Sequence, residues 1–283
     1  MVQHLIVPTD GSDESLRAVD IAAELARRCD ARVDIVEVVP DPDAVAGAEH
    51  DLARALDRVG PTDIEVTAMT ELSSGSVADG IVQLLDRSPE ATIVMASHGR
   101  GRSAAVIGSV TDDVLRREFG PIVVVGRRVD PTALDLGGPI VVTVDGSELS
   151  ESALPVAAAW AIELGVTPWV VGVIEPAVSM SPDVVETAYP ARLARRLRST
   201  SGHQTEFEVL HGHHVAETVD SFARSRGASF IVATTHGRSG LPRLALGSTA
   251  ADMVRHAACP VVLMRPPDLA GHGADASGTV ASR

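Results

Sequence analysis

The sequence of 283 residues contains no lysine and no asparagine, and all 24 of its basic residues are arginine. A P-loop of the form GxxxxGK[ST] therefore cannot occur anywhere in the chain. Aromatic side chains make up only 2% of the residues, so a core has to be built from Val, Ile, Leu and Ala. Such a core is typical of a buried parallel sheet that is covered by helices.

Cysteine and long apolar runs are also scarce. Cys29 and Cys259 are too few for a disulfide framework. No stretch reaches about 18 uninterrupted apolar residues, and the chain starts with a strand-like run instead of a basic leader. The net charge of −14 disfavours general binding to DNA or RNA, although a few local donors could still hold one nucleotide. We expect a cytoplasmic protein with no nucleic-acid partner and no membrane partner.

The sequence repeats itself. Residues 7–12 (VPTDGS) recur as 142–147 (VTVDGS), and residues 93–100 (IVMASHGR) recur as 231–238 (IVATTHGR). Gly108-Ser109 recurs as Gly247-Ser248, in the same order along the chain. A period of this length is a whole domain, so we expect a first copy at 1–126, a linker at 127–138 and a second copy at 139–266. The segment 267–283 has almost no large apolar residue and is expected to be disordered.

Each copy alternates short apolar runs with amphipathic stretches, a pattern that predicts β-α-β units. The sequence thus predicts an α/β fold with five parallel strands in each copy. Strands are expected at 5–7, 33–39, 64–69, 92–96 and 122–125, and again at 140–144, 168–174, 205–210, 230–233 and 261–264. Helices of the first copy are expected near 13–29, 43–58, 76–87 and 109–118.

A ligand crevice is expected where the first and fourth strands of a copy lie side by side. In open α/β sheets, ligands bind beyond the carboxyl ends of the strands, at the point where the winding reverses. Asp10-Gly11-Ser12 follows the first strand, and the segment from His98 to Ser109 follows the fourth. Both segments recur in the second copy, which predicts a second crevice.

The longer of these segments has features of a phosphate-binding turn. Gly99 and Gly237 could adopt positive φ and let a ligand approach the backbone closely. Gly108-Ser109 and Gly247-Ser248 open a helix, whose unpaired N–H groups attract anions. We expect the two serines to cap these helices, and Arg100 and Arg238 to add positive charge nearby.

This arrangement resembles the ATP-binding motif of the universal stress proteins, Gly-x2-Gly-x9-Gly-[Ser/Thr]. The Asp after the first strand, the SHGR and THGR segments and the Pro before the fifth strand are also similar to that family. The resemblance covers about 2–126 and 139–265. It implies a 3-2-1-4-5 strand order, helices on both faces, ATP with Mg²⁺ or Mn²⁺ on its phosphates, and a homodimer through the fifth strands.

Carried over by position, the resemblance implies nucleotide contacts in both copies. In the first copy these are Pro8, Thr9, Asp10, Val38, Met95, Ala96, His98, Gly99, Gly108, Ser109, Val110 and Thr111. In the second copy they are Asp145, Val173, Thr234, His236, Gly237, Gly247, Ser248, Thr249 and Ala250.

Both copies depart from the motif. Ala96 and Thr234 replace its first glycine, and the first copy has eight residues, one short, between Gly99 and Gly108. The spacing favours the second copy, whereas the Pro-Thr-Asp loop favours the first. Equal occupancy of the two sites is therefore not expected.

The leading interpretation is a stress-response sensor or regulator that binds ATP, with slow hydrolysis at most and an unidentified protein partner. His98 and His236 are the only repeated candidates for a catalytic base, and neither has an evident orienting carboxylate in the sequence. The alternative is a nucleotide-free scaffold of the same fold, which the missing first glycines favour.

Three other interpretations are weaker. The GxGxxA pattern at 99–104 follows the fourth strand instead of the first, which disfavours a dinucleotide site. An ATP-using ligase or pyrophosphatase usually carries Ser-Gly-Gly-x-Asp-Ser after its first strand, and this chain has Pro-Thr-Asp-Gly-Ser there. His211, His213 and His214 lack further ligands at a usable spacing, so a solvated loop is favoured over a metal site.

Overall fold

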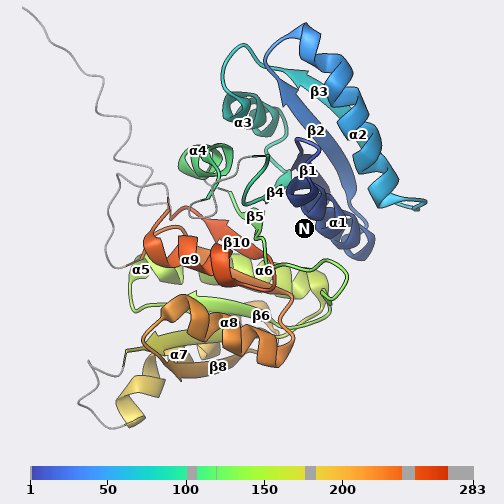
Figure 1. Cartoon of the computed structure of the whole chain (residues 1–283). Coiled ribbons are helices and arrows are strands. Elements are labelled where there is room, and N and C mark those ends of the chain that lie inside the picture. The colour runs from blue at the N-terminus through green and yellow to red at the C-terminus, as the bar shows by residue number, and fades with distance from the viewer. Residues whose placement is uncertain (1, 101–106, 119, 176–182, 238–245, 267–283) are drawn as a thin grey trace, which may run out of the picture.

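The computed structural model describes residues 2–100, 107–118, 120–175, 183–237 and 246–266, and all of its strands form one sheet (Figure 1). The sheet has ten strands in the order β3-β2-β1-β4-β5-β10-β9-β6-β7-β8. The segment 267–283, for which disorder was expected, lies outside the described residues, as does Arg238.

The first copy supplies one half of the sheet. Its strands are β1 (His4–Pro8), β2 (Arg32–Val39), β3 (Val66–Leu72), β4 (Thr92–Ala96) and β5 (Ile122–Val125). Its helices are α1 (Asp13–Cys29), α2 (Val45–Val59), α3 (Val77–Arg87) and α4 (Ser109–Arg117), with a 3₁₀ turn at Pro42–Ala44. The strands pair in parallel, which confirms the expected 3-2-1-4-5 order.

The second copy repeats this topology. Its strands are β6 (Ile140–Val144), β7 (Pro168–Ile174), β8 (Glu206–His211), β9 (Phe230–Thr234) and β10 (Val261–Met264). Its helices are α5 (Glu148–Glu151), α6 (Ala153–Leu164), α7 (Asp183–Ser201), α8 (Val215–Arg226) and α9 (Ser248–His256). The order β8-β7-β6-β9-β10 is again 3-2-1-4-5 within the copy, as expected.

The two copies are joined through their fifth strands, which run antiparallel to each other. Val123 lies opposite Val262 in this pairing, with Val124 and Ile122 opposite Val261 and Leu263. The resemblance had implied that fifth strands join two separate chains. In this structure the same kind of pairing forms within one chain, so β5 and β10 each have neighbours on both sides and leave no free edge for a second chain.

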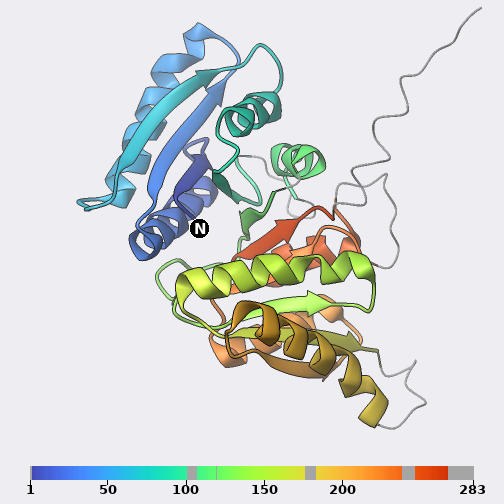
Figure 2. The same ribbon diagram turned by 180° about the vertical axis from the view of Figure 1, so that it is seen from behind.

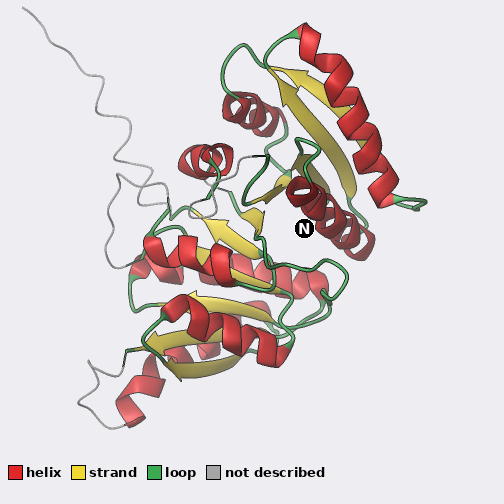
Figure 3. Ribbon diagram, viewed as in Figure 1, coloured by secondary structure: helices red, strands yellow, loops and turns green. Residues whose placement is uncertain are grey.

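Helices cover both faces of the sheet, as expected (Figure 3). One core packs α1, α2, α6 and α7 against the strands, and the other packs α3, α4, α8 and α9 against the opposite face. In the second copy, α8 and α9 lie in front of the strands in Figure 1, and α6 and α7 lie in front in Figure 2. Both cores are built mainly from aliphatic side chains, because parallel strands are buried on both faces.

The segment between the copies is packed onto the protein. Val129 and Leu136 are each 2% exposed and belong to the core beneath α1 and α6. Arg17 on α1 donates a hydrogen bond of 2.7 Å to the carbonyl oxygen of Arg127, and Arg28 donates one of 3.1 Å to that of Leu164. These contacts tie the segment and both copies together on one face of the sheet.

Candidate functional site

Each copy has the same tight turn after its first strand. Gly11 and Gly146 have φ values of 71° and 91°, a conformation that glycine adopts without steric cost. The Asp10 carboxylate accepts hydrogen bonds from the Ser12 N–H and hydroxyl at 3.1 and 2.5 Å, and Asp145 is bonded in the same way by Ser147. Asp-Gly-Ser therefore folds as a side-chain-stabilised turn that starts the next helix.

The loops after the first and fourth strands meet, as the sequence predicted. Strands β1 and β4 are neighbours, and the backbone N–H of Arg100 donates a 2.7 Å hydrogen bond to Asp10. A Cβ atom at Gly99 would overlap the Asp10 carboxylate, and one at Gly237 would overlap that of Asp145. These glycines do not have the positive φ that we expected. A side chain at either position would have to displace the facing aspartate carboxylate from the place where the two loops meet.

The helix that follows the fourth strand begins differently from the expectation. Gly108 and Gly247 are the N-cap residues, and no side chain caps either helix. Their N–H groups bond to the carbonyl oxygens of Ser97 and Thr235, both at 2.8 Å. Ser109 and Ser248 are exposed at the first helical position, so the prediction that they act as caps was wrong. A glycine cap contributes no oxygen, which leaves the N–H groups of the first turn available to an anion.

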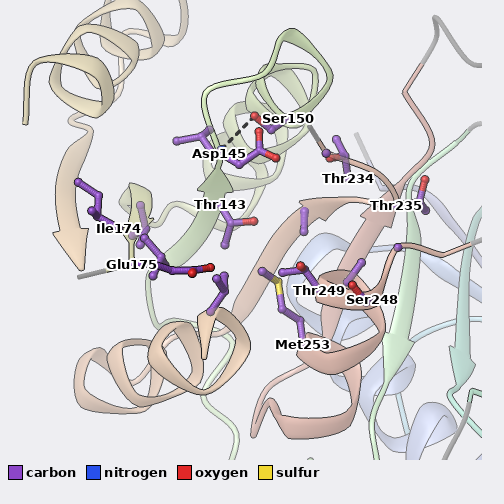
Figure 4. Close-up of a pocket in the computed structure, with 18 residues that line it drawn as sticks. Thr143, Asp145, Ser150, Ile174, Glu175, Thr234, Thr235, Ser248, Thr249 and Met253 are labelled. Carbon is purple, nitrogen blue, oxygen red and sulfur yellow. Dashed lines mark hydrogen bonds between the residues drawn. The ribbon is translucent and has the colours of Figure 1, made fainter. Parts of the chain in front are cut away.

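The second copy contains a cavity of about 600 Å³ at the carboxyl ends of its strands (Figure 4). Its polar side is formed by Asp145, by the β9 end and by the start of α9. Its apolar side comes from β7, β9, α8 and α9. The lining residues are Thr143, Val144, Asp145, Ser150, Val171, Val173, Ile174, Glu175, Val215, Ala233, Thr234, Thr235, Gly237, Gly247, Ser248, Thr249, Ala250 and Met253.

Most of the residues expected in the second copy thus lie around one cavity. Asp145, Val173, Thr234, Gly237, Gly247, Ser248, Thr249 and Ala250 line it. His236 is buried and its Nδ1 lies 3.1 Å from the Thr235 hydroxyl. Thr234, at the position of the missing glycine, donates a 2.7 Å hydrogen bond to the carbonyl oxygen of His236. The Thr234 hydroxyl thereby stabilises the loop that follows β9.

The expected residues of the first copy also lie close together. Around them, α3 packs more tightly on β2 than α8 packs on β7 in the second copy. A Cβ atom at Gly80 of α3 would lie 2.5 Å from the Val38 side chain, so α3 sits close over β2, and Val38 is 8% exposed. The α8 residue at the position of Gly80 is Thr218, and Val173, which matches Val38, is partly exposed to the cavity. Met95 fills the position of Ala233 and is 4% exposed.

The remaining expected residues of the first copy hold the same loops. Thr9 is buried and its hydroxyl lies 2.9 Å from that of Ser15, next to the half-buried Pro8. Thr111 donates a 2.9 Å hydrogen bond to the carbonyl oxygen of Ala96, and Val110 packs against the core under α3 and α4. His98 Nδ1 lies 3.0 Å from the Ser97 hydroxyl.

A group of charged residues sits beside Asp10 in the first copy. The guanidinium of Arg100, which was expected to add positive charge near the loop, pairs with Asp51 of α2. Glu37 of β2 lies near both, and one of its carboxylate oxygens is buried without a hydrogen-bond partner among the described residues. The second copy has Gly172 at this position.

The local electrostatics follow from this packing. Burial, with added repulsion from Asp51 and Asp10, raises the pKa of Glu37 to about 7, although Arg100 opposes the shift. Burial also raises the pKa of Asp10. The hydrogen bonds from Ser12, Arg100 and Ser15 outweigh that effect and hold this pKa below its ordinary value. Asp10 is therefore an ionised acceptor, whereas Glu37 titrates near neutrality.

Sequence reasoning missed the other residues that line the cavity: Thr143, Val144, Ser150, Val171, Ile174, Glu175, Val215, Ala233, Thr235 and Met253. Ser150 could have been found from the repeat, because Ser15 occupies the same place after VPTDGS. Glu175 carries no such signal, since its counterpart Pro40 differs in chemistry.

Comparisons with known proteins identify the family. The sequence profile of the Universal stress protein family matches residues 1–126 and 138–265. This chain belongs to the universal stress protein family. A universal stress protein of Mycolicibacterium smegmatis is 30% identical over 93% of this chain and 97% of its own length. Universal stress protein Rv1996 of Mycobacterium tuberculosis is 27% identical, with 93% and 95% covered.

Solved structures agree on the fold. A universal stress protein from Archaeoglobus fulgidus matches 93% of this chain and 98% of its own with a TM-score of 0.69 at 18% identity. One from Pseudomonas aeruginosa, described as a putative universal stress protein, matches 96% of each chain with a TM-score of 0.62 at 18% identity. Among the described residues, no helix is long and apolar enough to span a membrane.

Proposed function

We propose that this universal stress protein binds ATP in the cavity of its second copy and acts as a nucleotide-dependent stress sensor or regulator, with little or no hydrolysis. The observation that carries the proposal is a cavity of about 600 Å³ that ends at the uncapped start of α9. That volume lies within the range of about 300–1,000 Å³ that is usual for small-molecule sites.

The two ends of the cavity suit the two ends of a nucleotide. Gly247, Ser248 and Thr249 offer backbone N–H groups and the positive end of the α9 dipole to phosphate oxygens. Val173, Val215 and Met253 offer an apolar surface to the base and sugar. Mg²⁺ or Mn²⁺ would enter with the phosphates, and the Ser248 and Thr249 hydroxyls are the nearest side-chain oxygens on α9 that could support such an ion.

We infer a regulatory role because the two histidines that could act as catalytic bases are held within the loops. His98 and His236 bond to neighbouring hydroxyl groups, Ser97 and Thr235, which position them as parts of the loops. Occupancy of the cavity would change the surface around the turn after β6 and the start of α9, where a protein partner could bind.

Substitution of the exposed serine at the start of α9 tests the proposal. A glutamate at position 248 places a negative charge where phosphate would bind, yet acidic residues in the first turn stabilise a helix. Ser248→Glu should therefore lower ATP affinity by about 30-fold or more without lowering the melting temperature. Ser109→Glu, the matching change in the first copy, is the control and should leave the tightest binding phase intact.

Isothermal titration of ATP, ADP and AMP into the wild type and both variants gives the readout. Unchanged ATP affinity in Ser248→Glu, or equal losses in both variants, would contradict the assignment to the second copy. The nucleotide-free scaffold remains the second candidate, because Thr234 fills the position of the motif's first glycine. It would be favoured if the wild type binds none of the three nucleotides and mass spectrometry detects none released from the freshly purified, heat-denatured protein.

A further inference from the structure

Glu175 occupies the end of the cavity that lies across from the start of α9. It directly follows β7, and its side chain extends into the cavity, while Ser248 and Thr249 lie on the far side (Figure 4). The first copy has Pro40 at this position. Of the two copies, only the second therefore has a carboxylate at this position.

The carboxylates of the cavity are not equivalent. Asp145 already accepts hydrogen bonds from the Ser147 N–H and hydroxyl at 3.0 and 2.6 Å, which hold it in the turn after β6. Glu175 is exposed, and none of the described residues forms a hydrogen bond or ion pair with its carboxylate. Its oxygens are thus available to donors on a ligand.

The charge distribution orients a ligand along the cavity. The α9 start attracts anionic oxygens, whereas Glu175 repels them and accepts hydrogen bonds from N–H or O–H groups. The surface between the two ends includes Val171, Val173 and Val215, and the side chain of Thr143 lies beside them (Figure 4). A ligand that satisfies the whole cavity has phosphates at one end, a flat or apolar middle and a neutral donor at the other.

We propose that Glu175 is a specificity-determining residue that accepts a hydrogen bond from the nucleoside end of the ligand. This inference rests on the proposed nucleotide binding and adds a chemical requirement to it. A nucleoside triphosphate must present a donor, either the exocyclic amine of adenine or a ribose hydroxyl, to be bound tightly. A ligand that consists of phosphates alone is disfavoured by the negative charge of Glu175.

The test is a matrix of two proteins and five ligands, measured by isothermal titration. The proteins are the wild type and Glu175→Gln, which keeps the shape of the side chain but removes its charge. The ligands are ATP, 2′-deoxy-ATP, 3′-deoxy-ATP, purine riboside triphosphate, which lacks the 6-amino group, and inorganic tripolyphosphate. Glu217→Gln, at the start of the neighbouring α8, controls for the loss of one negative charge outside the cavity.

ATP affinity should fall about 5- to 20-fold in Glu175→Gln, because hydrogen bonds to a charged acceptor are stronger than neutral ones. The analogue that lacks the contacted donor should bind both proteins equally, and this identifies the amine or the hydroxyl. Tripolyphosphate should bind Glu175→Gln as tightly as the wild type or more tightly. A loss of ATP affinity without a loss of tripolyphosphate affinity cannot come from a damaged fold.

Two results would overturn the inference while ATP binding itself stands. One is equal ATP affinity in the wild type, Glu175→Gln and Glu217→Gln. The other is an equal loss of affinity in Glu175→Gln for ATP and for all three analogues, since Glu175 would then not recognise any single donor. A wild type that binds no ATP would overturn the proposed function and this inference together.

Discussion

The two copies share a fold but differ in what surrounds the ends of their first strands. In the second copy, Gly172, Ala233 and Thr218 stand where the first copy has Glu37, Met95 and Gly80. The first copy uses these positions for a charged group beside Asp10 and a close approach of α3 to Val38. The second copy keeps a cavity there. The two copies therefore share the same backbone fold, and a few side-chain differences give the matching region of each copy a different local chemistry.

The copies also differ in how their interiors are packed. Trp160 and Phe230 of the second copy form an edge-to-face pair with ring centroids 5.2 Å apart. The first copy has Leu25 and Thr92 at these places. A second edge-to-face pair, Trp169 with Phe222, also lies in the second copy, with ring centroids 5.5 Å apart.

The largest expected effect comes from removing that aromatic packing. Phe230→Ala should lower the free energy of unfolding by about 3–5 kcal/mol, because the fully buried ring leaves a cavity that its neighbours cannot fill. Thr92→Ala, at the matching position of the first copy, should cost about 1 kcal/mol or less. Urea denaturation followed by far-UV circular dichroism, to which both copies contribute, measures both, and similar losses would contradict the packing difference.

An intermediate effect is expected at the junction of the copies. A Cβ atom at Gly126, just after β5, would overlap the carbonyl oxygen of Val254 on α9. Gly126→Ala should therefore cost about 1–3 kcal/mol through forced displacement of one copy from the other. It should also separate thermal unfolding into two transitions in calorimetry.

Gly120→Ala is the matched control, because a Cβ at that position meets no other atom within 4 Å. It should unfold as the wild type does. If Gly126→Ala also unfolds as the wild type does, the added methyl group is accommodated, and the close approach of Gly126 to α9 does not hold the two copies together.

The smallest expected effect is a pH dependence confined to the first copy. The Glu37 pKa is about 7 in the folded chain and 4.5 in its ordinary environment, so the folded state resists ionisation of this carboxyl. The wild type should lose stability as pH rises from about 4.5 to about 7, because the unfolded chain releases the proton first. Glu37→Gln removes that loss.

The melting temperature of Glu37→Gln should thus match the wild type near pH 4.5 and exceed it by a few degrees above pH 7. Differential scanning fluorimetry across this range measures the difference. Gly172→Ala in the second copy carries no titratable group and should show no such trend. If the melting temperatures differ by the same amount at all pH values, the effect of the substitution comes from packing and not from ionisation of Glu37.

Much of the fold could be predicted because each element has a local signature. The helix expected at 13–29 is α1 (Asp13–Cys29), since Ser12 caps it and its apolar residues recur at helical spacing. The expected fifth strand at 122–125 is β5 as observed. The largest boundary difference falls at the edge strand β3, which spans Val66–Leu72 where 64–69 was expected, because partial exposure weakens its apolar pattern.

The site was predictable in outline but not in its side-chain roles. The repeat located both loops, and the contact between Arg100 and Asp10 confirms that they meet. The serine caps were wrong because Gly-Ser begins a helix equally well with the glycine as cap. The partner of the Arg100 guanidinium could not be foreseen, since Asp51 lies on α2, far from it in sequence.

The sequence by itself determined a duplicated α/β chain of the universal stress protein family. Periodicity and motif spacing are local properties, which can be recognised without knowing the tertiary contacts. Only the tertiary structure decided that β5 and β10 pair within one chain, and where the described cavity lies. Those outcomes depend on which side chains meet across distant segments, as Gly126 meets α9 and Glu175 faces the start of the same helix.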